Sequence, residues 1–252
     1  MKKLLLAALM LLTFTGMAHA YEMDGDTAVV YTFTDLIAAL NENKNIKLMN
    51  DIDAKDYSDD FYDYLYYGTY GRCKYSKVFD GNNKTISNLT VPGVASNYGG
   101  IVRYADGATI KNLTLSDLYY SCKDYTGGIC GRADSCIIEN CHVIGTSEIA
   151  YDFSYMGGIV GYISNTTITG CTTDVTVNGE QYVGGIFGYA ENNTVITDCT
   201  ASGTLIAHKS FSDYIGGIGG YTKDSTIKGC NTEVNITCNG DDAGGILVTI
   251  KK

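Results

Sequence analysis

Short segments in which apolar and polar residues alternate recur along most of this chain. In one of them, Ile159, Gly161 and Ile163 share one parity, whereas Val160 and Tyr162 share the other. Small or aliphatic residues fill the position of Ile163 in most equivalent segments, so we expect its parity to face a core and the other parity to face outward. A period of two over a few residues, interrupted by turn residues, predicts β-strands rather than helices.

The alternating segments begin with a repeated Gly-Gly-Ile sequence. It starts at residues 99, 127, 157, 184, 216 and 244, which gives intervals of 28, 30, 27, 32 and 28 residues. Self-similarity with a period of about 20–50 residues is typical of stacked-repeat proteins, because one repeat cannot bury its own apolar face.

A second strand is expected in each repeat after a short Ser/Asn/Asp turn. It carries an isoleucine at an inward position: Ile110, Ile138, Ile168, Ile196 and Ile227. Two residues later stands Asn, Asp or Gly, the types that adopt a left-handed conformation at least cost: Asn112, Asn140, Gly170, Asp198 and Gly229. We predict a bend with positive φ there, with Asn88 as its forerunner, after which the inward parity resets to a new column: Leu89, Leu113, Cys141, Cys171, Cys199 and Cys230.

Repeats of about 28 residues with three faces, each residue stacked on its own equivalents, predict an all-β fold of the parallel β-helix type. Since stacked strands lie about 4.8 Å apart, the expected six or seven turns form a rod about 30 Å long. Such a rod has one continuous core and counts as one domain.

The repeats resemble the GLUG-motif repeats of bacterial surface and secreted proteins, including the amino-terminal regions of some IgA-cleaving metallopeptidases. The residues that carry the resemblance are Gly157–Tyr162, Gly184–Tyr189, the Thr-Ile-x-x-Cys sequences at 167–171 and 226–230, and the leading segment 79–89. The resemblance covers roughly residues 79–250 and implies a right-handed parallel β-helix outside the cytoplasm. It does not imply peptidase activity, because the chain has no His-Glu-x-x-His sequence.

The N-terminal segments differ from the repeats. A basic start, the apolar stretch Leu4–Thr15 and a small-x-small sequence predict a signal peptide over 1–20, cleaved after Ala20, and hence a periplasmic or extracellular protein. Residues 21–53 are expected to form an N-terminal cap, with a strand over 28–33, a helix that begins at Thr34 and Asp35, and a first rod strand over 46–52. The helix would cover both the core and the unpaired edge at this end of the rod. A Tyr/Asp-rich insertion occupies 54–78, and the repeats fill 79–252.

The net charge narrows the range of partners. The whole chain has 18 basic and 28 acidic residues. Removal of Lys2 and Lys3 with the signal peptide leaves 16 − 28 = −12. An acidic surface disfavours nucleic acids and anionic membranes, and no apolar run after residue 20 approaches the length of a membrane span.

Nine cysteines in an exported protein suggest disulfides, and the odd number leaves at least one unpaired. The repeat favours a different interpretation for four of them, which occupy the inward column as small apolar residues and form a structural core of buried thiols: Cys141, Cys171, Cys199 and Cys230. Parallel side chains keep neighbouring Cβ atoms slightly too far apart for a disulfide, and a column does not make a tetrahedral zinc cage. We predict no metal site and no cofactor, while a bridge among Cys122, Cys130 and Cys136 stays open.

Tyrosines form two further columns in this alignment. One column stands two residues before the glycine pairs, with Tyr98 one residue out of step: Tyr125, Tyr155, Tyr182 and Tyr214. The other closes the Gly-Gly-Ile segments, with Arg132 substituting in the second repeat: Tyr104, Tyr162, Tyr189 and Tyr221. These rings either stabilise neighbouring turns by packing or bind sugar rings or a protein partner.

The insertion adds a cluster of four tyrosines: Tyr62, Tyr64, Tyr66 and Tyr67. Such a loop either folds back over the rod or recognises a ligand, because loops on a rigid scaffold often carry function.

Three functional classes follow from these features. The first is a secreted, non-catalytic recognition or adhesion module that binds a glycan or a surface protein through the tyrosines. The alternative is a polysaccharide-active lyase or glycoside hydrolase, since parallel β-helices house such enzymes, but acidic residues such as Asp106, Asp134 and Asp174 lie mostly in turns and scattered columns. A minor alternative is an ice-binding or other flat-array surface built from outward threonines: Thr90, Thr114, Thr172 and Thr200.

Overall fold

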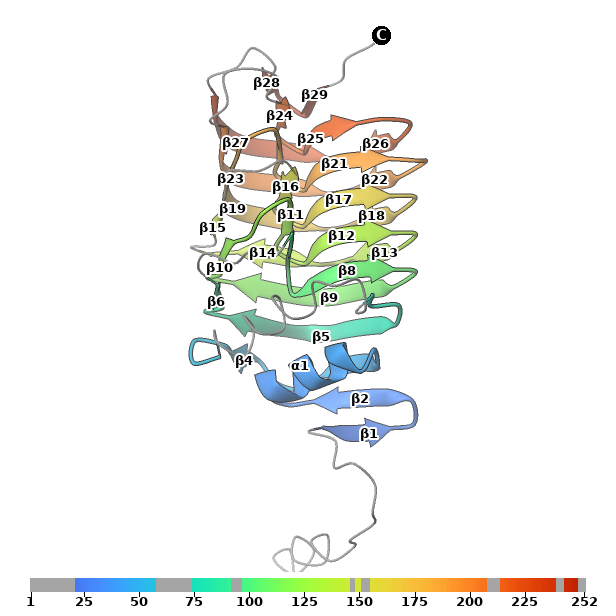
Figure 1. Ribbon diagram of the computed structural model, residues 1–252. Helices are drawn as coiled ribbons and strands as arrows, with labels where there is room; N and C mark the ends of the chain where they lie inside the picture. The colour runs from blue at the N-terminus through green and yellow to red at the C-terminus, as the bar shows by residue number, and fades with distance from the viewer. Residues whose placement is uncertain are drawn as a thin grey trace, which may run out of the picture.

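The computed structural model describes residues 21–57, 74–91, 97–145, 148–150, 155–207, 214–238 and 243–248. They form an elongated β-solenoid of about five turns with about 29 residues per turn (Figure 1). The predicted all-β parallel β-helix is confirmed. The turns are fewer than the expected six or seven because the first long rung contributes only to one sheet and the last Gly-Gly-Ile segment contributes two strands of two residues each.

Two of the three sheets have six strands each, all parallel. The first sheet contains the strands that precede or enter the glycine pairs: β7 (Tyr98–Gly99), β11 (Tyr125–Gly127), β16 (Tyr155–Gly157), β20 (Tyr182–Gly184), β24 (Tyr214–Gly216) and β28 (Ala243–Gly244). The second sheet contains the strands that follow them: β8 (Val102–Asp106), β12 (Cys130–Asp134), β17 (Val160–Ser164), β21 (Phe187–Glu191), β25 (Gly219–Thr222) and β29 (Leu247–Val248).

The large sheet forms the third side and contains 17 strands. Its main rungs are β5 (Val78–Ser87), β9 (Thr109–Ser116), β13 (Ile137–Glu139) with β14 (His142–Ile144), β18 (Thr167–Thr169) with β19 (Thr172–Gly179), β22 (Val195–Thr197) with β23 (Thr200–Ala207), and β26 (Thr226–Lys228) with β27 (Asn231–Cys238). Three short strands extend these rungs: β6 (Thr90–Val91), β10 (Tyr119–Ser121) and β15 (Glu148–Ala150).

The predicted bend is present in each of the five repeats. Its residues have φ between 51° and 66°, the left-handed region: Asn112, Asn140, Gly170, Asp198 and Gly229. The inward isoleucines before the bend are fully buried except Ile227 in the last rung, and Leu113, Cys141, Cys171 and Cys199 after it are also fully buried. The bend therefore resets the inward parity as the sequence indicated.

The register of the first rung is a correction. Thr85 and Ile86 pair with Thr114 and Leu115, and the register shifts between Asp80 and Lys84. The predicted positive φ at Asn88 is present (59°), but Asn88 follows the Ser87–Ser116 pair and is not equivalent to Asn112. Asn82 and Asn83 also have positive φ and form the bend of this rung. Thr90 pairs with Tyr119 rather than with Thr114. Leu89, although buried, therefore lies beside Leu118 and not in the cysteine column.

The predicted outward parity of Val160 is wrong. Val160, Ile163 and Ile159 are all fully buried. A side chain on Gly161 would meet the backbone oxygen of Tyr155 at 2.6 Å, so the first and second sheets approach each other closely there. The alternation fails at Val160 and Gly161, both buried, and in the rest of the strand Tyr162 and Ser164 are partly exposed.

The N-terminal cap comprises β1 (Glu22–Asp24), β2 (Thr27–Val30), α1 (Phe33–Asn41), β3 (Asn45–Leu48) and β4 (Ile52–Asp53). The helix begins earlier than expected because Thr32 is its N-cap: the Asp35 N–H donates to Thr32 Oγ1 at 3.2 Å, and the Thr32 N–H donates to Asp35 Oδ2 at 2.9 Å. Phe33 is thus a buried helix residue, not the end of a strand.

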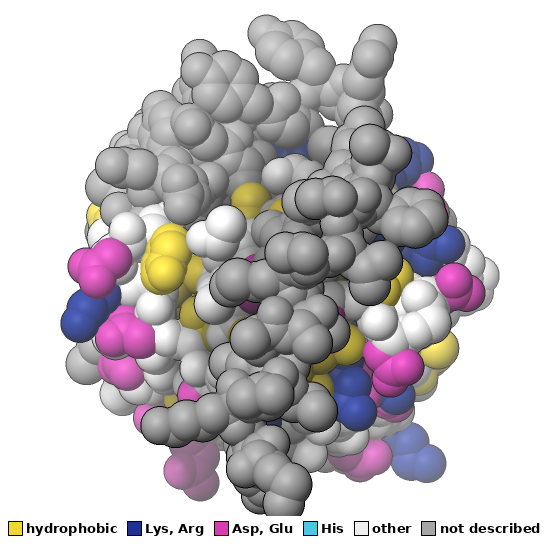
Figure 2. All heavy atoms as spheres, turned by 90° about the horizontal axis from the view of Figure 1, so that it is seen from below, with side chains coloured by type: hydrophobic (Ala, Val, Ile, Leu, Met, Phe, Trp, Pro, Cys, Tyr) yellow, Lys and Arg dark blue, Asp and Glu magenta, His cyan; other side chains and the backbone are white. Residues whose placement is uncertain are grey.

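The two ends of the rod are closed differently. At the N-terminal end, α1 buries Phe33, Leu36, Ala39 and Leu40 and connects the parallel pair β2 and β3. The antiparallel strand β1, not the helix, covers the edge of β2. Acidic and basic side chains lie around the rim of this end (Figure 2). At the other end, Ile227, Val234 and Ile236 are only partly buried, and Ile246 is 47% exposed.

Candidate functional site

In five of the six strands of the first sheet, all but β28, the first residue is a tyrosine. The strands pair in register, so that Tyr98, Tyr125, Tyr155, Tyr182 and Tyr214 lie above one another. Successive ring centroids are 5.3, 5.0, 4.9 and 5.1 Å apart, and the ring planes differ by at most 15°. We call these five residues the first column.

Tyr98 is aligned with this column and not out of step as the sequence suggested. Tyr98 pairs with Tyr125, an interval of 27 residues, whereas Val102 pairs with Cys130, an interval of 28. The one-residue difference between the two intervals falls between Tyr98 and Val102. Gly100 lies in this segment and has a φ of 154°, which residues with a side chain rarely adopt. The structure keeps the rings together and places the irregularity at the glycine.

The second column runs along the second sheet and consists of Tyr104, Arg132, Tyr162, Tyr189 and Tyr221. The ring centroids of Tyr162 and Tyr189 are 5.5 Å apart, and those of Tyr189 and Tyr221 are 5.1 Å apart. The Arg132 guanidinium lies 5.3 Å from the Tyr104 ring centroid and 4.7 Å from that of Tyr162, so a cation–π contact replaces the missing ring.

The two columns pack against each other. The rings of Tyr155 and Tyr189 meet edge to face with centroids 5.5 Å apart, and Tyr182 and Tyr189 meet in the same way at 5.4 Å. Offset stacking and edge-to-face contacts are the favoured aromatic geometries, each contributing about 0.5–1.5 kcal/mol beyond area burial. We call the two columns together the tyrosine face.

Carboxylates accept hydrogen bonds from hydroxyl groups of the second column. Tyr104 Oη donates to Asp134 Oδ2 at 2.6 Å, and Tyr162 Oη donates to Glu191. Asp134 also accepts from Arg132 Nε at 3.0 Å. Burial and these bonds raise the pKa of Tyr104, and burial raises the pKa of Tyr189 to about 12. These phenols therefore remain protonated donors around neutral pH.

The hydroxyl groups of the first column are different. Within the described part of the chain, no protein group hydrogen-bonds the hydroxyls of Tyr125, Tyr155, Tyr182 or Tyr214. Their rings are half-buried, and burial raises the pKa of Tyr155 and Tyr182. Each of these hydroxyls can both donate and accept a hydrogen bond to a ligand.

Stacking limits what the tyrosine face can bind. Tyr125, Tyr155 and Tyr182 each have a parallel ring on both sides, so both ring faces are covered. A sugar ring cannot stack on them there. What these residues present to a ligand is ring edges and a file of hydroxyls about 5 Å apart.

The four predicted insertion tyrosines, Tyr62, Tyr64, Tyr66 and Tyr67, lie outside the described residues. Both flanks of that segment contact the N-terminal cap. The rings of Tyr57 and Phe33 have centroids 5.5 Å apart. Tyr75 is 3% exposed and donates from its hydroxyl to the Lys44 carbonyl at 3.0 Å.

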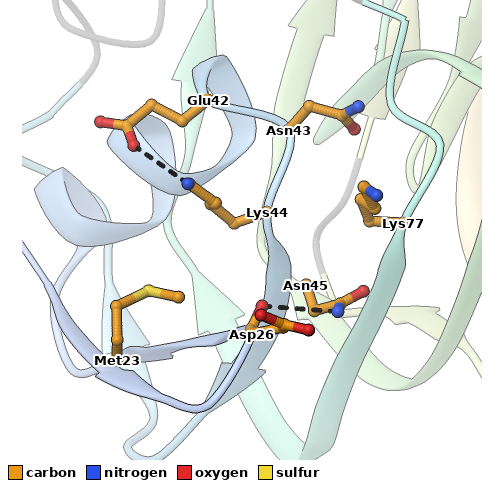
Figure 3. Close-up of a pocket in the computed structure, with 7 residues that line it drawn as sticks. All are labelled: Met23, Asp26, Glu42, Asn43, Lys44, Asn45 and Lys77. Carbon is orange, nitrogen blue, oxygen red and sulfur yellow. Dashed lines mark hydrogen bonds and ion pairs between the residues drawn. The ribbon is translucent and has the colours of Figure 1, made fainter.

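A polar pocket of about 390 Å³ lies in the N-terminal cap (Figure 3). Lys44 Nζ lies 4.0 Å from Glu42 Oε2. The pocket's amide groups already have protein partners. Asn45 Nδ2 donates to the Asp26 carbonyl at 3.4 Å within the pocket (Figure 3). Asn43 accepts from the Ser76 N–H at 2.9 Å, and Asn45 accepts from the Val78 N–H at 3.1 Å. These amides hold the cap to the first long rung.

Other chemistry suggested by the sequence is not assembled in the described residues. No group of three or more His, Cys, Asp or Glu is placed there to hold one metal ion, and no disulfide joins the cysteines of those residues, including Cys122, Cys130 and Cys136. In the threonine array, His142 interrupts the column and its Nδ1 lies 2.7 Å from Thr172 Oγ1. No helix in the described part is long and apolar enough to cross a membrane.

Comparisons with known proteins agree with the repeat and the fold. Residues 125–148 and 179–206 match the family model "The GLUG motif", so the chain carries GLUG repeats, and the two segments contain Tyr125 and Tyr182. No curated protein matches the sequence.

Two solved structures share the fold. One is an IgA1 protease, with 18% identity and a TM-score of 0.54 over 87% of this chain and 21% of that one. The other is a candidate immunoglobulin A1 protease from Bacteroides ovatus, with 16% identity and a TM-score of 0.54 over 89% of this chain and 85% of that one. The chain thus spans about a fifth of the length of the first protein, and at these identities the likeness concerns the fold alone.

Proposed function

We propose that this GLUG-repeat β-helix is an extracellular, non-catalytic recognition module that binds a neutral glycan chain along the tyrosine face. The observation that carries the proposal is the file of four hydroxyls without a protein partner in the described residues: Tyr125, Tyr155, Tyr182 and Tyr214. Stacking holds their rings in one geometry, so little conformational freedom is lost when they bind.

The geometry of the file favours an extended ligand. Its three steps of 5.0, 4.9 and 5.1 Å place the outer hydroxyl-bearing rings about 15 Å apart. This step is comparable to the length of one pyranose unit in an extended chain. Each sugar can then exchange a hydrogen bond with one phenol, while the ring edges contact its C–H groups.

The charge of the protein favours a neutral glycan over an anionic one. The chain carries a formal net charge of −10, and the Glu191 carboxylate, bonded to Tyr162, lies beside the file, whereas Asp134 is paired with Arg132. A sulfated or uronate-rich chain would meet the Glu191 carboxylate at close range and be repelled.

The test removes the hydroxyls and keeps the rings. In the triple variant Tyr125→Phe, Tyr155→Phe, Tyr182→Phe the stacking is preserved, so we expect the melting temperature to stay close to that of the wild type. Loss of three hydrogen bonds of about 0.5–1.5 kcal/mol each should weaken glycan binding by roughly 10-fold to 1,000-fold. Binding is measured first on an array of neutral glycans and then by calorimetry.

The matched control is Tyr189→Phe, in the second column, whose hydroxyl lies 3.5 Å from Glu191 Oε2. It should leave glycan binding unchanged. If the triple variant binds with wild-type affinity, the first column is not the site. If no neutral glycan binds while a surface protein does, the glycan assignment is wrong.

A further inference from the structure

A column of four thiols runs through the core along the rod, separate from the tyrosine face. The column consists of equivalent residues in successive rungs: Cys141, Cys171, Cys199 and Cys230. The strand residues before and after each cysteine in the sequence pair in register with those of the neighbouring rung. The first three are fully buried, and Cys230 in the last rung is partly exposed.

The sulfur atoms of this column are neighbours. The Cys171 S–H lies 3.8 Å from the Ile138 carbonyl of the preceding rung, and the Cys230 S–H lies 3.9 Å from the Ile196 carbonyl. The Cys199 N–H donates to Cys230 Sγ at 3.4 Å. The S–H groups are also within reach of carbonyls two residues earlier, Thr197 O at 3.2 Å for Cys199 and Lys228 O at 3.6 Å for Cys230.

The spacing of the rungs suits a bridging ion better than a disulfide. Parallel in-register strands keep successive Cβ atoms about 4.8 Å apart, whereas a disulfide needs about 3.5–4.5 Å. Two metal–sulfur bonds in line, each about as long as the 2.3 Å Zn–S bond, span about 4.6 Å, which matches the rung spacing. Linear coordination needs two ligands only, so it does not require the three-ligand cluster that is missing from the described residues.

We propose that Cys199 and Cys230 form a two-coordinate site for a soft, thiophilic cation of the Cu(I) and Ag(I) class. Thiolate sulfur selects such ions over hard cations. Cys230 supplies the entry point because it is the only member of the column in a partly exposed position, and the N–H bond from Cys199 stabilises negative charge on its sulfur.

Charge balance defines the bound form. Two neutral thiols and one monovalent cation give a thiolate–metal–thiol unit and one released proton, so the site stays neutral. Loss of both protons would leave a net negative charge in an apolar column, which burial penalises.

The probe is Ag⁺ alone, added to the reduced full-length protein, because silver needs no reductant to stay monovalent. Native mass spectrometry counts the bound ions and the displaced protons, and thiolate-to-silver absorption bands report the affinity. Other cysteines also take up silver, so the decisive quantity is the difference between variants. Cys230→Ser should bind one ion fewer than the wild type, with affinity at this site reduced by on the order of 100-fold or more.

Cys238→Ser is the matched control, since Cys238 ends the same strand β27, is also partly exposed and lies off the column. It should keep the silver ion of the column. Cys199→Val provides a second test, and circular dichroism of each variant verifies folding. If Cys230→Ser binds as many ions as the wild type with equal affinity, or if Cys238→Ser loses the ion instead, the proposal is wrong.

Discussion

The second glycine of each Gly-Gly-Ile segment gives the sharpest test of how closely successive rungs approach. A Cβ atom added at Gly185 would lie 2.3 Å from the carbonyl oxygen of Gly217 and 2.4 Å from the Cβ of Ala201. At Gly245, the same position in the last repeat, no heavy atom lies within 4 Å of the added Cβ. We therefore predict that Gly185→Ala destabilises the protein and that Gly245→Ala does not.

The expected magnitude follows from these contacts. Both overlaps are about 1 Å inside normal van der Waals contact, and one partner is backbone that cannot move without separating two rungs. Overpacking in a dense core costs about 1–3 kcal/mol, and two simultaneous overlaps place Gly185→Ala near the upper end. For a chain of this size about 3 kcal/mol corresponds to a fall of roughly 6–12 °C in melting temperature. Gly245→Ala should stay within about 0.5 kcal/mol of the wild type.

The assay is thermal unfolding followed by far-UV circular dichroism, with the two variants and the wild type at equal concentration. Adding Ala201→Gly to Gly185→Ala should restore part of the stability, because it removes one of the two overlaps and leaves the other. A Gly185→Ala variant that melts within about 2 °C of the wild type would refute the claim that close rung approach requires this glycine.

Two further predictions concern the buried thiols and phenols. Burial raises the pKa of Cys136 to about 11 from 9.0 and that of Tyr189 to about 12 from 10.0. Both groups therefore lose their protons at a lower pH in the unfolded chain than in the folded protein. The free energy of unfolding should be constant up to about pH 9 and fall between about pH 9 and 12; urea titrations showing a flat profile across this range would contradict it. Cys171→Ser should destabilise by about 1–3 kcal/mol because it buries a hydroxyl, whereas Cys171→Val, read in the same titrations, should be better tolerated.

The repeat made the central features of the fold predictable. The bend residues and the inward cysteine column could be located from the sequence because each is a single residue type, or a small set of types, at a fixed place in the repeat. Asn140 and Gly170, for example, share a left-handed backbone, and Cys171 is fully buried. The preference of Asn, Asp and Gly for left-handed backbone, together with a fixed place in each repeat, is sufficient to predict these features.

The errors arose where contact with another rung overrides the local rule. Val160 is buried because the close approach at Gly161 interrupts the alternation, which no single segment reveals. The register of β5 shifts at Asn82 and Asn83 because that rung packs on the cap as well as on β9. The helix start at Thr32 was missed, although Thr32 and Asp35 have the three-residue spacing of a capping box.

The tyrosine face was found as two columns, but its chemistry depends on contacts that alignment does not show. Sequence reasoning treated Arg132 only as a substitution. In the structure it lies between two rings and bonds Asp134. The covered ring faces were also not predictable, because the tilt of the rings is set by packing between the columns.

The contrast between the two columns bears on function. The second column needs its polar groups for structure: phenols bond Asp134 and Glu191, and the place of one ring is taken by Arg132, which keeps the packing and the bond to a carboxylate. Four members of the first column use only their rings, since within the described residues the hydroxyls of Tyr125, Tyr155, Tyr182 and Tyr214 bond no protein group. Phenylalanine would satisfy the same stacking contacts, yet tyrosine stands at every one of these positions. A hydroxyl that packing does not use, repeated at about 5 Å along a rigid file, is what a ligand-binding surface requires, and substitution by phenylalanine separates that role from packing.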